Sequence, residues 1–145
     1  MTFVIDKRLT TSSTPILELK LSSLFLKDDA TYPWLILIPR VENTSEVYQL
    51  DQAQQAVLIE EINITSLILK KCFSPHKINI GALGNIVEQL HIHVVGRFRE
   101  DPTWPQSIWQ ANQTIRPYDL KTKEENINKL KQAYHSLIST VSIQW

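Results

Sequence analysis

The chain of 145 residues contains one cysteine and no long apolar run. It therefore has few of the features typical of disulfide-bonded exported proteins or of membrane proteins. A single cysteine, Cys72, excludes an internal disulfide, and its place on an apolar helical face indicates a buried structural thiol. The longest apolar stretch, Pro33 to Pro39, is far below the roughly 20 residues of a membrane-spanning helix. The N-terminal charges follow a very short apolar run, the reverse of a secretory signal. We therefore expect a soluble, cytoplasmic protein that contacts no membrane.

The chain also lacks an excess of charge of either sign, because 15 basic residues balance 15 acidic ones and the pI is about 6.9. Such a protein has no global basic field for general nucleic-acid binding, so any anionic ligand must be held locally. A hydrophobic content of 43% over 145 residues is enough for one compact domain, and too little chain for two ordinary ones. We expect residues 1–145 to form a single domain.

Histidine is scarce as well, yet two of the four histidines lie in the segment 87–95, VEQLHIHVV. Side chains alternate between the two faces of a β-strand, so this segment predicts one polar face and one apolar face. The polar face carries Gln89, His91 and His93. The apolar face carries Leu90, Ile92 and Val94. The pattern predicts a half-buried strand that presents two imidazoles and a carboxamide in a row.

Two of the three glycines, Gly81 and Gly84, come directly before this segment, and Asn85 follows them. Glycines let backbone N–H groups approach a ligand closely, and such concave loops often bind anions. The loop and the histidine strand together predict a phosphate site.

The segments before this loop predict a β-hairpin followed by a helix. Alternation over residues 16–26 indicates one strand with a bulge or kink near Ser22 and Ser23. The polar segment 27–33 reads as a turn, and residues 34–38 as a central strand. Asp51 with Gln54 predicts the start of a helix from about residue 52 to about residue 72.

The second half of the chain predicts one more strand and one more helix. Ser74 and Pro75 end the first helix, and a strand over 77–80 leads into the glycine loop. Thr122 with Glu125 predicts a capping box for a C-terminal helix over about 122–141. Its expected apolar stripe consists of Ile127, Leu130, Tyr134, Leu137, Ile138 and Val141.

These motifs together resemble the histidine triad (HIT) superfamily of nucleotide hydrolases and transferases, whose signature is His-φ-His-φ-His-φ-φ after a glycine-rich loop. Here the first histidine is replaced by Gln89, with His91 and His93 at the other two positions. A bacterial branch of the superfamily has this glutamine and a downstream Trp-Pro-x-x-φ-Trp segment, which Trp104 to Trp109 matches. The resemblance covers roughly residues 17–109.

The resemblance implies an α+β fold with an antiparallel sheet of about five strands and two helices. It implies hydrolysis or transfer of a nucleotide phosphoester, phosphoramidate or dinucleoside polyphosphate through a nucleotidyl-histidine intermediate, with a purine nucleotide or dinucleotide as substrate, no cofactor and a homodimer. His91 would attack the α-phosphate, His93 would contact phosphate and leaving-group oxygens, and Gln89 would occupy the place of the first histidine. The nucleotide would be held by Gly81, Gly84, Asn85 and either Asp28 or Asp29 on the ribose.

Three alternatives remain open from the sequence. His91 and His93 could be half-buried histidines with a purely structural role. The His-x-His spacing also suits a metal, although no third ligand is apparent. Finally, the domain could bind a nucleotide without turning it over, since the Gln89 amide neither titrates nor carries charge. Trp104 and Trp109 could wall the site or contact a partner subunit.

Overall fold

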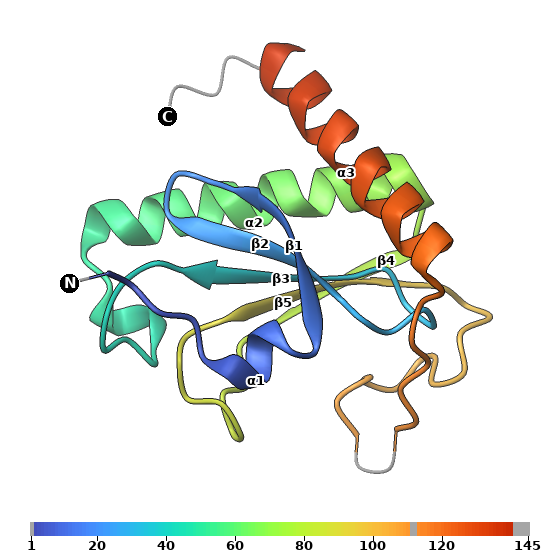
Figure 1. Cartoon of the computed structure of the whole chain (residues 1–145), viewed down its shortest axis with the longest axis horizontal. Coiled ribbons are helices and arrows are strands. Elements are labelled where there is room, and N and C mark those ends of the chain that lie inside the picture. Colours follow the sequence, from blue (N-terminus) through green and yellow to red (C-terminus); the bar gives the residue numbers. More distant parts are fainter. Residues whose placement is uncertain (1, 111–112, 141–145) are drawn as a thin grey trace.

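A five-stranded antiparallel sheet in the order β1-β2-β3-β5-β4 forms the centre of the protein (Figure 1). The computed structural model describes residues 2–110 and 113–140. The strands are β1 (Ser13–Glu18), β2 (Ser22–Lys27), β3 (Trp34–Pro39), β4 (Lys77–Gly81) and β5 (Ile92–Arg97). The helices are α1 (Lys7–Thr10), the 3-10 helix η1 (Val47–Gln49), α2 (Gln52–Phe73) and α3 (Leu120–Thr140). The expected α+β architecture is confirmed, and the short helices α1 and η1 are additions to it.

The first hairpin corrects the expectation of one kinked strand over residues 16–26. The chain reverses between Glu18 and Ser22, so that β1 and β2 pair antiparallel, and the register shift lies between Pro15 and Leu17. A fully buried carboxylate of α2, Glu61, accepts hydrogen bonds from the turn N–H groups of Leu21 (2.6 Å) and Ser22 (3.2 Å). The turn is therefore stabilised from a distant helix, a contact that local alternation cannot reveal.

The predicted hairpin of β2 and β3 and the central position of β3 are confirmed. Strand β3 pairs with β2 on one side and with β5 on the other. Its continuous apolar sequence fits burial on both faces: Leu35 and Leu37 join the core under α2, whereas Ile36 and Ile38 join a second cluster with Leu9.

Helix α2 begins and ends close to the predicted limits. The Asp51 carboxylate accepts from the Gln54 backbone N–H at 2.8 Å, and the Gln54 side chain accepts from the Asp51 N–H at 2.9 Å. The helix ends at Phe73, and its C-cap Ser74 adopts the left-handed conformation with φ 51° before Pro75.

Helix α3 begins earlier than the sequence pattern suggested. Asp119, not Thr122, is the capping residue, because its carboxylate accepts from the backbone N–H of Thr122 at 2.8 Å. Thr122 itself lies in the first turn. The predicted apolar stripe packs on the core through its buried member Leu130, and Val141 lies outside the described residues.

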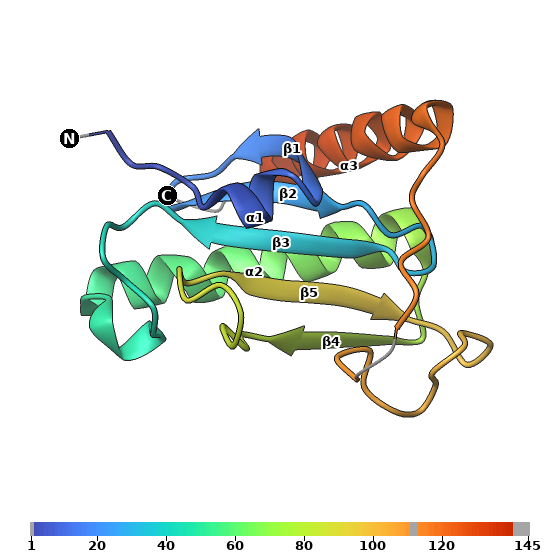
Figure 2. The ribbon, with the colours of Figure 1, turned by 60° about the horizontal axis from the view of Figure 1, so that its bottom comes forward.

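The two faces of the sheet have different covers, which sets the position of the site (Figure 2). Helix α2 packs on one face, with Leu90, Ile92 and Val94 in that core as predicted. The opposite face carries α1 and several loops, and His91 and His93 lie on this side. No described helix combines the length and apolar character that a bilayer crossing requires.

Candidate functional site

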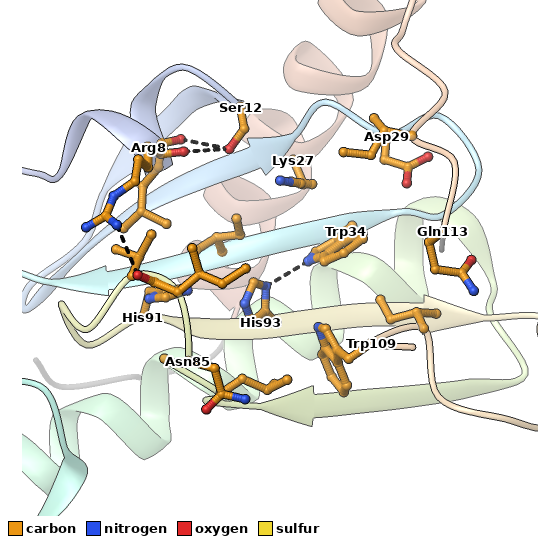
Figure 3. A pocket seen from close by; sticks show the side chains of 18 of the residues that line it. Arg8, Ser12, Lys27, Asp29, Trp34, Asn85, His91, His93, Trp109 and Gln113 are labelled. Atoms are coloured by element: carbon orange, nitrogen blue, oxygen red, sulfur yellow. Dashed lines mark hydrogen bonds between the residues drawn. The ribbon is translucent and has the colours of Figure 1, made fainter. Parts of the chain in front are cut away.

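A cavity of about 730 Å³ opens on the face of the sheet that carries the histidines (Figure 3). Its volume lies within the range of small-molecule sites. The walls come from α1, the β2–β3 region, the glycine loop, the histidine segment and residues 108–110, 113 and 115. The cavity brings together five of the predicted site residues: Asp29, Gly84, Asn85, His91 and His93. Trp109, whose role the sequence left open, also lines it.

His91 is 6% exposed, and its Nδ1 lies 2.7 Å from the backbone carbonyl oxygen of Gln89. A carbonyl can only accept, so Nδ1 carries the proton and donates. The lone pair therefore resides on Nε2 of a side chain that lines the cavity. This is the tautomer that a nucleophilic imidazole requires.

His93 carries the opposite tautomer. The indole Nε1–H of Trp34 donates to His93 Nδ1 at 2.9 Å, and because an indole can only donate, Nδ1 is unprotonated. Burial, followed by the nearby His91 and Lys27, lowers the pKa of His93 from 6.5 to about 3. His93 is therefore neutral at neutral pH, with its proton on Nε2, and can donate a hydrogen bond without a charge.

Aromatic rings fix the histidine pair. The ring centroids of His91 and His93 are 4.9 Å apart at an interplanar angle of 75°. The His93 ring centroid also lies 5.6 Å from that of Trp34 and 5.7 Å from that of Trp109. Lys27 places its Nζ 5.6 Å from the Trp34 ring centroid, and burial lowers the pKa of this ammonium. Aromatic rings and one partly buried cation thus lie around the His93 ring.

The structure separates the two aspartates that the sequence left as alternatives. Asp29 is 4% exposed and lines the cavity, where its Oδ1 accepts from the Thr31 N–H at 3.0 Å. Asp28 instead accepts from the Tyr118 N–H at 3.1 Å and lies 3.9 Å from the Lys123 ammonium. Of the pair, Asp29 is the one that can reach a ligand in the cavity.

The two glycines serve different purposes. Gly84 has φ +66°, a left-handed conformation that glycine adopts without strain, and it lines the cavity beside Asn85. Gly81 pairs with His93 across β4 and β5 and is not among the lining residues. A Cβ atom at Gly81 would lie 3.0 Å from the Trp109 ring, so the glycine lets that ring approach the sheet.

Gln89 lies outside the cavity lining, and its side chain is bound at both ends to the N-terminal segment. Its Oε1 accepts from the Asp6 N–H at 2.8 Å, and its Nε2 donates to the Val4 carbonyl at 2.9 Å. Its backbone carbonyl is the group that holds His91.

The loop that delivers Trp109 is fixed by a buried ion pair. Arg97 and Asp101 have side chains only 1% and 3% exposed, with Nε and Oδ2 2.9 Å apart. The Asp101 carboxylate also accepts from the backbone N–H of Trp104 at 2.8 Å, and the Arg97 guanidinium lies 5.6 Å from the Trp104 ring centroid. Trp104 is thus a packing residue at the base of this loop.

A family model for the HIT domain matches residues 8–100. The chain belongs to the HIT family. Its fold is shared with solved histidine triad proteins from Sinorhizobium meliloti (39% identity, TM-score 0.88, covering 91% of this chain and 97% of that one) and Bradyrhizobium japonicum (35%, 0.89, 92% and 99%). A histidine triad protein from Marinobacter aquaeolei is 34% identical, with a TM-score of 0.89 over 94% of this chain and 99% of that one. No curated protein matches this chain.

The HIT family includes nucleotide hydrolases and transferases, so the geometry of His91 and His93 is considered below with phosphate chemistry in view. In the described part of this HIT protein, no three histidine, cysteine, aspartate or glutamate side chains gather closely enough to hold a metal ion. Cys72 is half-buried on α2, and burial raises the pKa of its thiol.

Three contributors to the HIT site were missed from the sequence. Trp34 fixes the tautomer of His93, Lys27 supplies a cation, and the segment around Arg8 forms a wall. Lys27 stands at the end of an alternating strand on the same face as Phe25, a signal that could have located it. The Trp34 contact depends on the pairing of Ile36 with His93, which no local pattern encodes.

Proposed function

We propose that this HIT protein hydrolyses or transfers a nucleotide phosphoester, phosphoramidate or dinucleoside polyphosphate. The observation that carries the proposal is the 2.7 Å contact from His91 Nδ1 to the Gln89 carbonyl, which leaves Nε2 free beside the cavity. The Nε2 lone pair attacks the α-phosphorus, and the bond from phosphorus to the leaving group breaks. Water then attacks phosphorus, the P–N bond breaks, and a nucleoside monophosphate leaves while His91 is regenerated. In a transferase, another acceptor takes the place of this water.

The Gln89 carbonyl also supports the intermediate. When Nε2 is bonded to phosphorus the imidazole becomes cationic, and the hydrogen bond from Nδ1–H to the carbonyl becomes charge-assisted. Neutral His93 has the complementary role of donating its Nε2–H to a phosphoryl oxygen. It neutralises no charge itself, so Lys27 is the cation that we expect to face the phosphate.

We assign the rest of the nucleotide to the remaining walls. Asp29 accepts from the ribose hydroxyls, and the loop of Gly84 and Asn85 approaches the phosphates. The Nε1–H of Trp109 is buried and has no hydrogen-bond partner among the described residues. A buried donor without a partner is costly, so we expect a ligand atom to accept from it. The apolar walls suit a purine base.

Product formation tests this proposal directly. We expect the parent protein to release AMP from adenosine phosphoramidate or from a diadenosine polyphosphate, as followed by chromatography. Samples denatured at alkaline pH, where a P–N bond to histidine survives, should contain a chain heavier by one adenylyl group, and His91→Ala should lack it. If neither AMP nor the adenylylated chain forms from any of these substrates, the enzymatic proposal is wrong.

A nucleotide-binding module is the second candidate function. The pKa of His93 near 3 and the engagement of Gln89 with the N-terminal segment favour it, because neither residue supplies a mobile proton at neutral pH. This candidate predicts a ligand-dependent rise in thermal stability with AMP but no product.

A further inference from the structure

We propose that Gln89 is a positioning residue that fastens residues 4–12, here called the N-terminal strap, over the site. The inference rests on the proposed function for its kinetic consequences only. It explains why an amide stands where the HIT signature has its first histidine.

The two side-chain bonds of Gln89 have opposite polarity. Oε1 accepts from the Asp6 N–H and Nε2 donates to the Val4 carbonyl, so one amide satisfies a donor and an acceptor of the same extended segment. A carboxylate at this position can only accept and would face the Val4 carbonyl without a donor. A neutral imidazole also has one donor and one acceptor, but these two nitrogens lie on different edges of a rigid ring and point in different directions. It therefore cannot bond the Asp6 N–H and the Val4 carbonyl as the carboxamide does. The carboxamide fits both partners from a single end.

A second attachment is made by Arg8, two residues after Asp6 in the strap. Arg8 Nη1 donates to the Ile86 carbonyl at 3.0 Å, while Nη2 pairs with the Asp6 carboxylate at 2.7 Å. Asp6 also accepts from the Arg8 backbone N–H, and hydrogen bonds from Arg8 lower the pKa of Asp6 to about 2. The strap is thus tied to the segment 86–89 at two points.

The fastened strap completes the cavity. Leu9 is buried against Phe25, Ile36 and Val87, and Arg8, Leu9 and Ser12 all line the site (Figure 3). The backbone of Gln89 meanwhile holds the Nδ1–H of His91. One residue therefore joins the wall of the cavity to the orientation of the nucleophile.

The test compares Gln89→His and Gln89→Glu with Gln132→His, a matched change on the exposed side of α3. Backbone hydrogen exchange of Asp6, measured by NMR and normalised to the intrinsic rate, reports strap fastening without any turnover. We expect exchange about tenfold faster or more in both Gln89 variants and unchanged in Gln132→His, because two hydrogen bonds are lost or weakened. Amides of β3 should keep their protection, which shows that the sheet remains folded.

Acidification gives a signature that a merely structural change would not produce. A protonated glutamic acid has one donor and one acceptor at the end of the chain, as the amide does. Protection of Asp6 in Gln89→Glu should therefore recover as the pH falls through about 4.3, the ordinary pKa of the glutamate side chain. Gln89→His should show no such recovery.

Kinetics then separate this inference from the proposed function. With AMP as ligand and a diadenosine polyphosphate as substrate, we expect Gln89→His to raise Kd and KM about fivefold or more. Parent-like Asp6 protection in Gln89→His would overturn the inference, as would a fall in kcat alone with the strap still protected. Altered Asp6 exchange in a protein that turns over no nucleotide would leave the inference standing and remove only the hydrolase.

Discussion

Two histidines separated by one residue carry their protons on opposite ring nitrogens, because one faces an acceptor and the other a donor. The Gln89 carbonyl holds the proton of His91 on Nδ1, and the Trp34 indole keeps Nδ1 of His93 bare. The sequence placed Leu90, Ile92 and Val94 on the apolar side correctly. The strand expected over residues 87–95 begins only at Ile92, so Gln89 and His91 lie in the segment before β5. The sequence could not assign the tautomers of the two histidines, because Trp34 is 59 positions away from His93 in the chain.

The nucleophile is the residue whose loss should separate binding from turnover. In His91→Ala we expect turnover to fall by about 10³-fold or more, since attack on phosphorus has no substitute group. The Kd for AMP, measured by calorimetry, should change by less than about fivefold, because His93 and the loop contacts remain. His135→Ala on the exposed side of α3 is the control. Equal losses of binding and turnover would contradict this division.

The buried neutral state of His93 predicts a pH dependence of stability. Its pKa is about 3 in the fold and about 6.5 when unfolded, so the unfolded chain binds an extra proton between these values. This contribution to the free energy of unfolding is present above about pH 6.5 and is lost as the pH falls toward 3. Urea titrations should show that the free energy of unfolding changes less between pH 7.5 and pH 4.5 in His93→Asn than in the parent. An unchanged difference would argue against the lowered pKa.

The unpartnered indole N–H of Trp109 predicts a selective loss of affinity. Trp109→Phe keeps an aromatic ring over Gly81 but removes the donor. We expect the Kd for AMP to rise about three- to tenfold, in keeping with one hydrogen bond, while Tm changes little. An unchanged Kd would show that no ligand atom accepts from this group.

At the scale of elements, the loop after β5 depends on one ion pair. Arg97 and Asp101 are both buried, and removing one partner leaves the other charge without compensation. Asp101→Asn should lower the free energy of unfolding by about 3–5 kcal/mol in urea titrations. Arg99→Lys, a change on the exposed neighbour of this pair, is the control. A loss below about 1 kcal/mol would mean that backbone contacts alone hold the loop.

The elements that the sequence predicted well are those with local signals. The Asp51 and Gln54 capping box, the stop at Ser74 and the hairpin before β3 all depend on neighbouring residues. The first hairpin was misread as one strand because its turn is capped by Glu61 from α2. Helix α1 was missed because four residues give no periodic pattern.

At the scale of the whole molecule, the sequence indicated one α+β domain with a site on the histidine face. The closure of that site by the strap was not predicted, and Trp109 was left open between walling the site and contacting a partner, because these residues meet the sheet only through contacts distant in the chain. Composition and periodicity describe what an element buries, whereas they do not say which loop lies above it.

We also propose that the protein is a homodimer, on the strength of its resemblance to HIT proteins that pair. Light scattering after gel filtration should give a mass of about twice 16.8 kDa across a hundredfold range of concentration. A mass of one chain at high concentration would exclude the dimer.

The side-chain hydrogen bonds of Gln89 join it to residues that are 83 and 85 positions away in the sequence. This separation determines when the strap can dock during synthesis. The strap leaves the ribosome before Gln89, which follows only after strands β1 to β4 have been translated. Contacts of such long range also form late in refolding, because closing a long loop is costly in entropy. Secondary structure should therefore appear before the protein can bind its ligand, and the delay between the two measures how long the strap takes to dock.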